Sequence, residues 1–396
     1  MGSDLTIDPP MPALVQGRTI APASNDARHN LSVRNWRSLD NHLDIAAWDA
    51  LARDNAEPNP FYESWNLLPA LEEFDPDGRV KIWTMQCDGR LVALLPIRQE
   101  MGYYNYPLPH LRNWTHGNCF FGAPLVAPGY EKLFWARVFG QADLQAGASF
   151  FLHLAQMPAT GPLQIALASV LAGDGQDRPA ATVMREERAA LVSLASPETY
   201  FMQTLTTKKR KELRRQQRRL EEEGTLEVER HADAEGLEQW TVDFLALEKR
   251  GWKGKSGSAL ACDKRTARLF TRALKGAALR GRLERLALTI DGKPIAMLAN
   301  FITLPGAFSY KTTFDEDYAR FSPGVLLQRE NLELLARDDI AWADSCAASD
   351  HPMIDRFWRE RRAIAYHSIG IGGRIRRAVF KALARKETGR PVGGLS

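Results

Sequence analysis

Two stretches of the chain alternate apolar and polar positions on either side of a tight-turn dipeptide. Residues 80–99, VKIWTMQCDGRLVALLPIRQ, place β-rich runs around Asp88-Gly89. Residues 282–302, RLERLALTIDGKPIAMLANFI, do the same around Asp291-Gly292. An Asp-Gly pair between two such runs is a strong short-range signal for a β-hairpin. The pattern therefore predicts two hairpins, roughly 200 residues apart.

Each hairpin follows a helical stretch that contains tryptophan and phenylalanine. NPFYESWNLLPALEEF precedes the first, and EQWTVDFLALEKRGW precedes the second. This repetition indicates two copies of one α/β unit, although two unrelated hairpins with a common turn would give the same pattern. A boundary fits near residues 191–205, where a Ser-Pro pair interrupts the pattern. We expect a disordered lead (1–30), an N-terminal domain (31–195), a C-terminal domain (196–372) and a basic helix with a tail (373–396).

Two segments predict basic helices. Residues 206–224, TTKKRKELRRQQRRLEEEG, carry eight Lys or Arg between 208 and 219, with Leu205, Leu213 and Leu220 on a narrow apolar seam. Cations at the start and anions at the end of a helix oppose its macrodipole, so local stability does not explain this order. A cationic face of this kind attracts cofactor phosphates, anionic lipid or nucleic acid. A solvated helix held by tertiary contacts is the alternative.

The second basic helix is GRIRRAVFKALARKE (373–387), in which Ile375, Val379 and Leu383 recur at four-residue spacing. We expect this apolar seam to cover a patch of the protein's own surface. The alternative is that the helix lies on a membrane surface.

Composition indicates an ordinary globular protein. The chain has 396 residues with 44% apolar content, enough for a large core, and its 52 basic and 48 acidic side chains leave a net charge of +4. Overall charge gives no reason to expect nucleic acid as a partner. The four cysteines form no CxxC pair, and no stretch approaches 18 consecutive apolar residues. We expect a cytoplasmic protein, with a peripheral position at the inner membrane face as an extension of that expectation.

Several familiar chemistries are excluded by motif. There is no GxSxG elbow, no HExxH and no complete GxxxxGK[ST], and the eight histidines do not cluster at metal-ligand spacing. We therefore expect no metal site. What remains is Ser-Pro-Gly at 322–324, where Ser322 suits a helix cap and Pro323 the first helical position. Gly324 costs helix stability unless something approaches the bare backbone, either an anion at the helix N-terminus or a neighbouring strand.

The order of segments in residues 195–370 closely resembles the GNAT acyltransferase superfamily, specifically its FemAB-like and cellulose-biosynthesis (CelD-like) branch. The matching pieces are KKRKELRRQQRRLEEEG, FLALEKRGW, LTIDGKPIAMLANFI, YKTTFDEDYARFSPGVLLQRENLELL and the short strand IAWADS. Weaker echoes in the first half are NPFYESW, DGRLVALLPI and LRNWTHGNCFFGAPLV. The resemblance implies a mixed α/β (α+β) fold of two tandem GNAT-like domains, each with a mostly antiparallel sheet flanked by helices.

The resemblance also implies where a donor would bind. Two adjacent strands splay apart in this fold, here the strand ending near Thr313 and the strand IAWADS, and the pantetheine arm of acyl-CoA lies between them. The pyrophosphate would rest on the helix that starts at Ser-Pro-Gly. We therefore expect the donor-binding residues to be Ser322, Gly324, Val325 and Leu326. The superfamily's phosphate loop usually carries glycines two residues apart, whereas here Val325 follows Gly324 and the second glycine is absent.

The implied reaction is direct transfer of an acyl group from a thioester to an amine, which requires a general base near pH 7. His351 is the first choice as base, and capping of a turn is its structural alternative. Asp344 would orient His351 or bind the substrate ammonium, Asp315 or Asp317 would bind the ammonium, and a backbone N–H near Tyr310 would stabilise the oxyanion. Trp252 and Arg361 are further candidates for contact with substrate. Cys346 as a covalent acyl carrier is a less favoured option.

The function that follows is an acyl-CoA-dependent N-acyltransferase. Its acceptor would be a lipid amine, such as a long-chain base, or an amino sugar, and its further partner an anionic membrane surface. Two alternatives stay open: a FemX-like transferase that uses aminoacyl-tRNA to extend a peptidoglycan precursor, and a non-catalytic accessory protein of polysaccharide biosynthesis.

Overall fold

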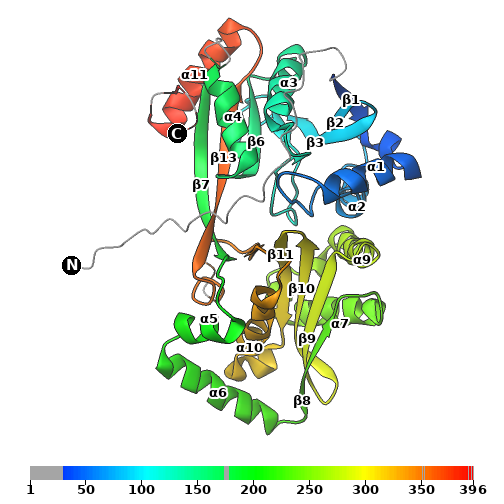
Figure 1. The fold of residues 1–396 in the computed structure, drawn as a ribbon, viewed down its shortest axis with the longest axis vertical. Coiled ribbons are helices and arrows are strands. Elements are labelled where there is room, and N and C mark those ends of the chain that lie inside the picture. Colours follow the sequence, from blue (N-terminus) through cyan, green and yellow to red (C-terminus); the bar gives the residue numbers. More distant parts are fainter. Residues whose placement is uncertain are drawn as a thin grey trace, which may run out of the picture.

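The computed structural model describes residues 30–173, 178–349, 351, 353–390, 392, 393 and 395. Strands and helices alternate along the chain (Figure 1). The strands are β1 (Leu31–Asn35), β2 (Lys81–Cys87), β3 (Arg90–Glu100), β4 (His110–Asn113), β5 (Leu125–Val126), β6 (Phe151–Pro158), β7 (Ala180–Leu191), β8 (Leu226–His231), β9 (Leu283–Ile290), β10 (Lys293–Thr303), β11 (Gly306–Phe314), β12 (Trp342–Asp344) and β13 (Glu360–Gly370).

The helices flank these strands. They are α1 (His42–Arg53), α2 (Ser64–Phe74), α3 (Glu131–Leu144), α4 (Pro162–Gly173), α5 (Pro197–Thr204), α6 (Thr207–Glu221), α7 (Leu237–Arg250), α8 (Trp252–Lys255), α9 (Lys264–Ala278), α10 (Pro323–Glu330) and α11 (Arg374–Thr388). Short 3-10 helices are η1 (Trp36–Leu39), η2 (Leu260–Cys262), η3 (Glu316–Phe321) and η4 (Asn331–Ala336). Among the described helices none is both long and apolar enough to cross a membrane.

Both predicted hairpins are present. The pairs β2–β3 and β9–β10 are antiparallel. Asp88, Gly89, Asp291 and Gly292 all have φ between 47° and 77°, as a tight Asp-Gly turn that follows the twist of the strands requires.

The described strands form one sheet whose order repeats. The path is β1-β2-β3-β4-β6-β13-β7-β12-β11-β10-β9-β8, with β5 beside β3. In the first half β1 to β4 are antiparallel and β4 then pairs in parallel with β6. In the second half β8 to β11 are antiparallel and β11 then pairs in parallel with β12. The predicted fold class, a mixed and mostly antiparallel α/β arrangement in two copies, is confirmed.

The two halves share their sheet and their core. Strand β13 lies between β6 and β7, so the chain returns to the first half after completing the second. The end of β7 pairs with β12, and α2 packs against α9 across the halves (Figure 1). One apolar cluster includes Phe61 and Trp65 of the first half with Phe301 and Phe308 of the second. The division near residue 195 stays a prediction.

The apolar seams predicted for the two basic helices differ in how well they agree with the structure. In α6, Leu213 and Leu220 are buried, as predicted, and Leu205 packs against the cluster that contains Leu213. In α11 the predicted seam is wrong, because Ile375 is 83% exposed and Val379 41% exposed. Its buried residues are Phe380 and Ala384, and the Phe380 ring packs against Phe151 with centroids 5.4 Å apart. The large aromatic side chain sets which face docks, which turns the helix away from the predicted seam.

Candidate active site

The parallel pair β11–β12 separates after three residues. Gly306, Ala307 and Phe308 pair with Trp342, Ala343 and Asp344, and the ladder ends there. Strand β11 continues to Phe314, whereas the segment that follows β12 turns away at Cys346, whose φ is 53°. Residues 309–314 of β11 therefore lie beyond their pairing with β12, as the resemblance implies.

Strand β11 is also irregular on its other edge. Ser309 pairs with Asn300 and Lys311 with Ala299, so Tyr310 is the extra residue of a β-bulge. A bulge leaves one residue out of the ladder and re-aims neighbouring side chains. This supports the prediction that a backbone N–H near Tyr310 is available to a ligand. The phenol itself is buried, and burial raises its pKa, so it stays protonated at neutral pH.

Aromatic side chains of the first half pack on this part of β11. The ring of Phe61 lies 5.9 Å from those of Phe308 and Tyr310, and the ring of Phe120 lies 5.9 Å from that of Tyr310. Phe61 comes from NPFYESW and Phe120 from LRNWTHGNCFF, the stretches that resemble the family only weakly. Phe61 and Phe120 thus line one side of the candidate site in the second half.

Lys311 points its amine into this aromatic environment. Its Nζ lies 4.8 Å from the centroid of the Phe120 ring and 5.5 Å from that of Tyr310. Burial, helped by the charge of Lys253, lowers the Lys311 pKa to about 8, while Glu248 opposes the shift. Among the described residues Lys311 forms no ion pair. An amine with this pKa exists in both charge states near neutral pH, as acid–base chemistry requires.

Lys253 and Glu248, by contrast, are tied to each other. Lys253 Nζ donates to Glu248 Oε1 at 2.9 Å and to the Thr312 carbonyl at 3.0 Å, and the Leu260 amide donates to Glu248 Oε2 at 2.7 Å. The pair thus anchors the end of α7 to β11, a structural role. It leaves Lys311 as the cation available at this site.

The side chain of Asp344 forms an ion pair with Arg362. Fully buried, it accepts from Arg362 Nη1 at 3.1 Å and from the Cys346 amide at 2.8 Å. Arg362 also donates to Glu57 at 2.5 Å and lies 4.0 Å from the Trp342 ring centroid. Burial raises the pKa of Glu57, and Arg362 opposes that shift. The prediction that Asp344 orients His351 or binds the substrate ammonium stays a prediction, beside the contacts that Asp344 makes with Arg362 and Cys346.

The surroundings of His351 and Cys346 bear on their predicted roles as general base and as covalent acyl carrier. His351 Nδ1 lies 3.5 Å from the Ile354 amide nitrogen, and the His351 carbonyl accepts from the Asp355 amide at 3.0 Å, which are the contacts of a turn. Its role as base stays a prediction. Burial raises the pKa of the Cys346 thiol well above its usual value, which disfavours the thiolate that covalent catalysis needs.

The remaining predicted substrate residues lie on the surface. Asp315 caps η3 by accepting from the Asp317 amide at 3.1 Å and lies 3.5 Å from Arg250. Asp315 and Asp317 line a pocket of about 120 Å³, and Trp252 is 55% exposed. Arg361 is held by Asp355 at 2.7 Å on the outer face of β13. Among the described residues, none of these four makes a hydrogen bond, ion pair or ring contact with Lys311.

The start of α10 differs from the predicted anion cradle. Ser322 adopts a left-handed conformation with φ 57° and makes no side-chain cap, and its carbonyl accepts from the amides of Val325 (2.9 Å) and Leu326 (3.1 Å). Of the three amides predicted to bind an anion, those of Val325 and Leu326 already donate to the Ser322 carbonyl. Only the Gly324 amide donates to no acceptor among the described residues. A Cβ at 324 would lie 3.3 Å from Met353 Sδ and from Phe314 Cδ1. Side chains, and not solvent, surround the bare backbone here.

Residues 207–352 match the family model described as an acetyltransferase (GNAT) domain. This part of the chain is therefore a GNAT-type domain.

Two solved structures share the fold of this chain. The crystal structure of FemX aligns with a TM-score of 0.54 at 8% identity, covering 86% of this chain and 98% of that one. A conserved protein of unknown function from Bacteroides thetaiotaomicron aligns with a TM-score of 0.52 at 10% identity, covering 83% and 97%. None of the curated proteins compared with the chain matches it. The predicted FemAB-like resemblance is thereby confirmed at the level of fold.

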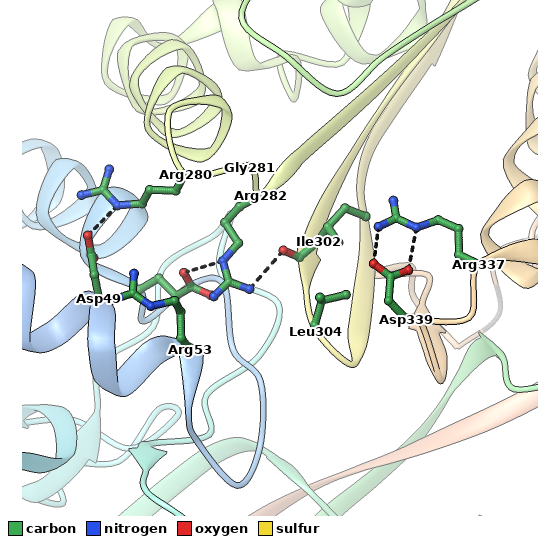
Figure 2. Close-up of a pocket in the computed structure, with 10 residues that line it drawn as sticks. Asp49, Arg53, Arg280, Gly281, Arg282, Ile302, Leu304, Arg337 and Asp339 are labelled. Atoms are coloured by element: carbon green, nitrogen blue, oxygen red, sulfur yellow. Dashed lines mark hydrogen bonds and ion pairs between the residues drawn. The ribbon is translucent and has the colours of Figure 1, made fainter.

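A larger pocket, of about 410 Å³, lies between the two halves of the protein (Figure 2). Lys311 is not among the residues that line it. Arg280 pairs with Asp49 at 2.8 Å, and Arg337 pairs with Asp339 at 2.8 Å. Glu63 accepts from Trp65 Nε1 at 2.7 Å and lies 3.6 Å from Arg282 Nε. Burial raises the Glu63 pKa to about 7 despite the two arginines nearby. Nearly every charge here already has a partner.

Sequence reasoning missed Lys311 and its aromatic neighbours. The available signal was a single lysine in GAFSYKTTF, a strand that is otherwise apolar or hydroxyl-bearing. Its importance rests on Phe120, which is 191 positions away in the chain, so no local pattern could reveal it. Within the described residues, no group of three or more His, Cys, Asp or Glu side chains could hold a metal ion.

Proposed function

We propose that this acyltransferase moves an acyl group from a thioester, acyl-CoA, onto the primary amine of an acceptor. The acceptor class is a lipid amine, such as a long-chain base, or an amino sugar. The observation that carries the proposal is the position of Lys311 on the part of β11 that β12 leaves unpaired. Its half-buried amine forms no ion pair with a carboxylate of the described residues.

The proton balance of the transfer suits that amine. The acceptor is an ammonium ion at neutral pH, and the neutral Lys311 amine takes one of its protons. The acceptor nitrogen then attacks the thioester carbonyl carbon, and the tetrahedral intermediate loses the second surplus proton of that nitrogen to solvent. Its collapse breaks the C–S bond and leaves the neutral amide. The leaving thiolate takes the proton back from Lys311. A thiol titrates near about 8.5, close to the Lys311 pKa of about 8, so neither proton transfer is steeply uphill.

The carbonyl oxygen becomes an anion in that intermediate and needs a donor. The bulge at Tyr310 supports a role for a backbone N–H of this stretch, because a bulged residue lies outside the strand ladder. Lys311, one residue further on, then stands next to the reacting carbon along the same strand.

The experiment is a matched screen of donors and acceptors. Acyl-CoA thioesters of short and long chain are incubated with sphingosine or glucosamine, with release of free thiol and product mass as readouts. Transfer to either amine supports the proposal. Absence of both transfer and calorimetric binding of coenzyme A at millimolar concentration contradicts it, and carbohydrate binding without turnover would favour the polysaccharide accessory protein.

One observation favours a second candidate, an aminoacyl-tRNA-dependent transferase. The start of α10, where an acyl-CoA pyrophosphate would rest, is packed by Met353 and Phe314. Seven cations of α6 are exposed: Lys208, Lys209, Lys211, Arg214, Arg215, Arg218 and Arg219. A donor carried on RNA would use such a surface and would need no pyrophosphate site at α10.

The two donors give different salt dependences. Binding of tRNA would weaken steeply as salt rises, with a slope that falls when α6 cations are replaced by glutamine. Binding of acyl-CoA would change little in the same variant. Tight, salt-sensitive tRNA binding combined with no acyl-CoA turnover would replace the leading proposal by the second.

A further inference from the structure

Helix α11 has one face docked on the protein and one face turned outward. The docked residues are Phe380 and Ala384. The outward residues, here called the α11 outer face, are all exposed: Arg374, Ile375, Ala378, Val379, Ala382, Arg385 and Lys386. Ile375 and Val379 are one helical turn apart and are 83% and 41% exposed. Helix α11 therefore presents aliphatic surface outward, most of it from Ile375.

A second exposed apolar group adjoins this helix. Tyr103 is buried, and its hydroxyl donates to Glu387 Oε1 near the end of α11 at 2.8 Å. Around it, the loop after β3 exposes Met101 (63%), Tyr104 (73%) and Tyr106 (64%). The exposed loop residues are thereby tied to the C-terminal end of α11. The loop thus adds three exposed apolar side chains near the C-terminal end of α11, whereas Ile375 and Val379 lie in the first two turns of the helix.

The charges of α11 divide in the same way. On the docked side, Arg377 and Arg178 share Asp143 at 2.8 and 2.9 Å. On the α11 outer face, Arg374, Arg385 and Lys386 form no ion pair with the described acidic side chains. Glu387, the single acidic residue of the helix, is engaged by Tyr103. The outward face therefore combines aliphatic side chains with uncompensated positive charge.

Helix α6 provides a comparison, because its exposed face carries cations without exposed aliphatic side chains. It has more exposed cations than α11, but its leucines Leu213 and Leu220 are buried. Figure 1 places α6 and α11 at opposite ends of the molecule. The two helices thus separate two features, charge alone and charge together with exposed aliphatic groups.

We propose that the α11 outer face and the loop residues Met101, Tyr104 and Tyr106 dock on an anionic lipid bilayer. Aliphatic side chains gain from entering the headgroup and acyl boundary, tyrosines suit that boundary, and Lys or Arg beside them attract anionic headgroups. A nucleic acid offers no environment for Ile375 and Val379, and a second copy would bring like charges together. This proposal does not depend on the catalytic one.

The experiment is cosedimentation of the full chain with vesicles of phosphatidylcholine, with and without phosphatidylglycerol. Three variants are compared: Ile375→Ser with Val379→Ser, Arg385→Gln with Lys386→Gln, and the α6 control Lys208→Gln with Lys209→Gln and Lys211→Gln. All substituted residues are exposed, so a thermal melt should show them folded.

We expect binding to the phosphatidylglycerol vesicles alone, weakened about tenfold by the aliphatic pair and by the cation pair, and changed less than about twofold by the α6 control. Equal weakening by the α6 control would overturn the proposal in favour of unspecific charge attraction. So would an absence of vesicle binding, or a dimer in light scattering that Ile375→Ser with Val379→Ser dissociates. Tight RNA binding that is lost with the α11 cations would also overturn it.

Discussion

The Lys311 ammonium lies 4.8 Å from the centroid of the Phe120 ring, across the boundary between the two halves of the sheet. A cation over an aromatic face is attracted by about 0.5–2 kcal/mol, less than a buried carboxylate would provide. The contact therefore holds the amine in place without fixing it in the charged state. This is what a group that exchanges protons during catalysis requires.

Lys311→Met tests the proton-transfer role. We expect kcat/KM to fall by about 10²–10⁴ fold, the usual contribution of a general base. The wild-type rate should rise with pH through about 8, because the neutral amine is the active form, and this limb should vanish in the variant. Lys311→Arg keeps the charge but cannot supply a neutral amine, so recovery of activity in that variant would indicate electrostatic stabilisation instead. His351→Ala is the parallel test of the base predicted from the sequence.

Arg362→Gln tests the buried charge pair behind the site. Arg362 neutralises both Asp344, which is fully buried, and Glu57, whose side chain is 12% exposed. Its loss leaves two buried carboxylates, and we expect the free energy of unfolding to fall by about 3–5 kcal/mol. Arg361→Gln is the matched control on the same strand, because its pair with Asp355 is 34% and 35% exposed and should contribute less than about 1 kcal/mol. Urea denaturation that shows equal losses for the two would contradict the assignment.

Local sequence patterns predicted the repeat but not the composition of the site. The Asp-Gly turns and the alternation around them were enough to locate both hairpins, because these signals act between near neighbours. The docked face of α11 was predicted wrongly, since spacing alone cannot tell which of two apolar stripes meets the core. Lys311 was missed because its environment is made by Phe120 of the other half. The ion pair between Asp344 and Arg362 was also missed, because Arg362 is 18 positions further along the chain.

Gly324→Ala tests whether a donor approaches the start of α10. Alanine gains about 0.5–1 kcal/mol in a helix over glycine, and the new Cβ would make tight contacts of 3.3 Å with Met353 and Phe314 that offset the gain. We therefore expect the stability to stay within about 1 kcal/mol. If acyl-CoA displaces Met353 to reach this backbone, the KM for acyl-CoA should rise with kcat little changed. An unchanged KM would place the donor elsewhere.

Glu63→Gln tests the buried carboxyl in the pocket between the halves. The Glu63 pKa is about 7 in the folded protein, against an ordinary value of 4.5. Between these values the folded state binds more protons than the unfolded state, so this group makes the free energy of unfolding fall as pH rises through the window. Above about pH 7 the Glu63 side chain is ionised in both the folded and the unfolded state, and its contribution to the free energy of unfolding is then fully lost. Glutamine does not titrate, so relative to wild type the variant should gain about 1–3 kcal/mol between about pH 5 and 8.

Urea denaturation across that pH range measures the effect, with Glu198→Gln on the exposed side of α5 as the matched control. Arg282 sets the size of the expected gain, because it lies 3.6 Å from Glu63 and stabilises the ionised form. If the stability curves of Glu63→Gln and wild type run parallel, Glu63 titrates as an ordinary carboxylate, and the ion pair with Arg282 outweighs its burial.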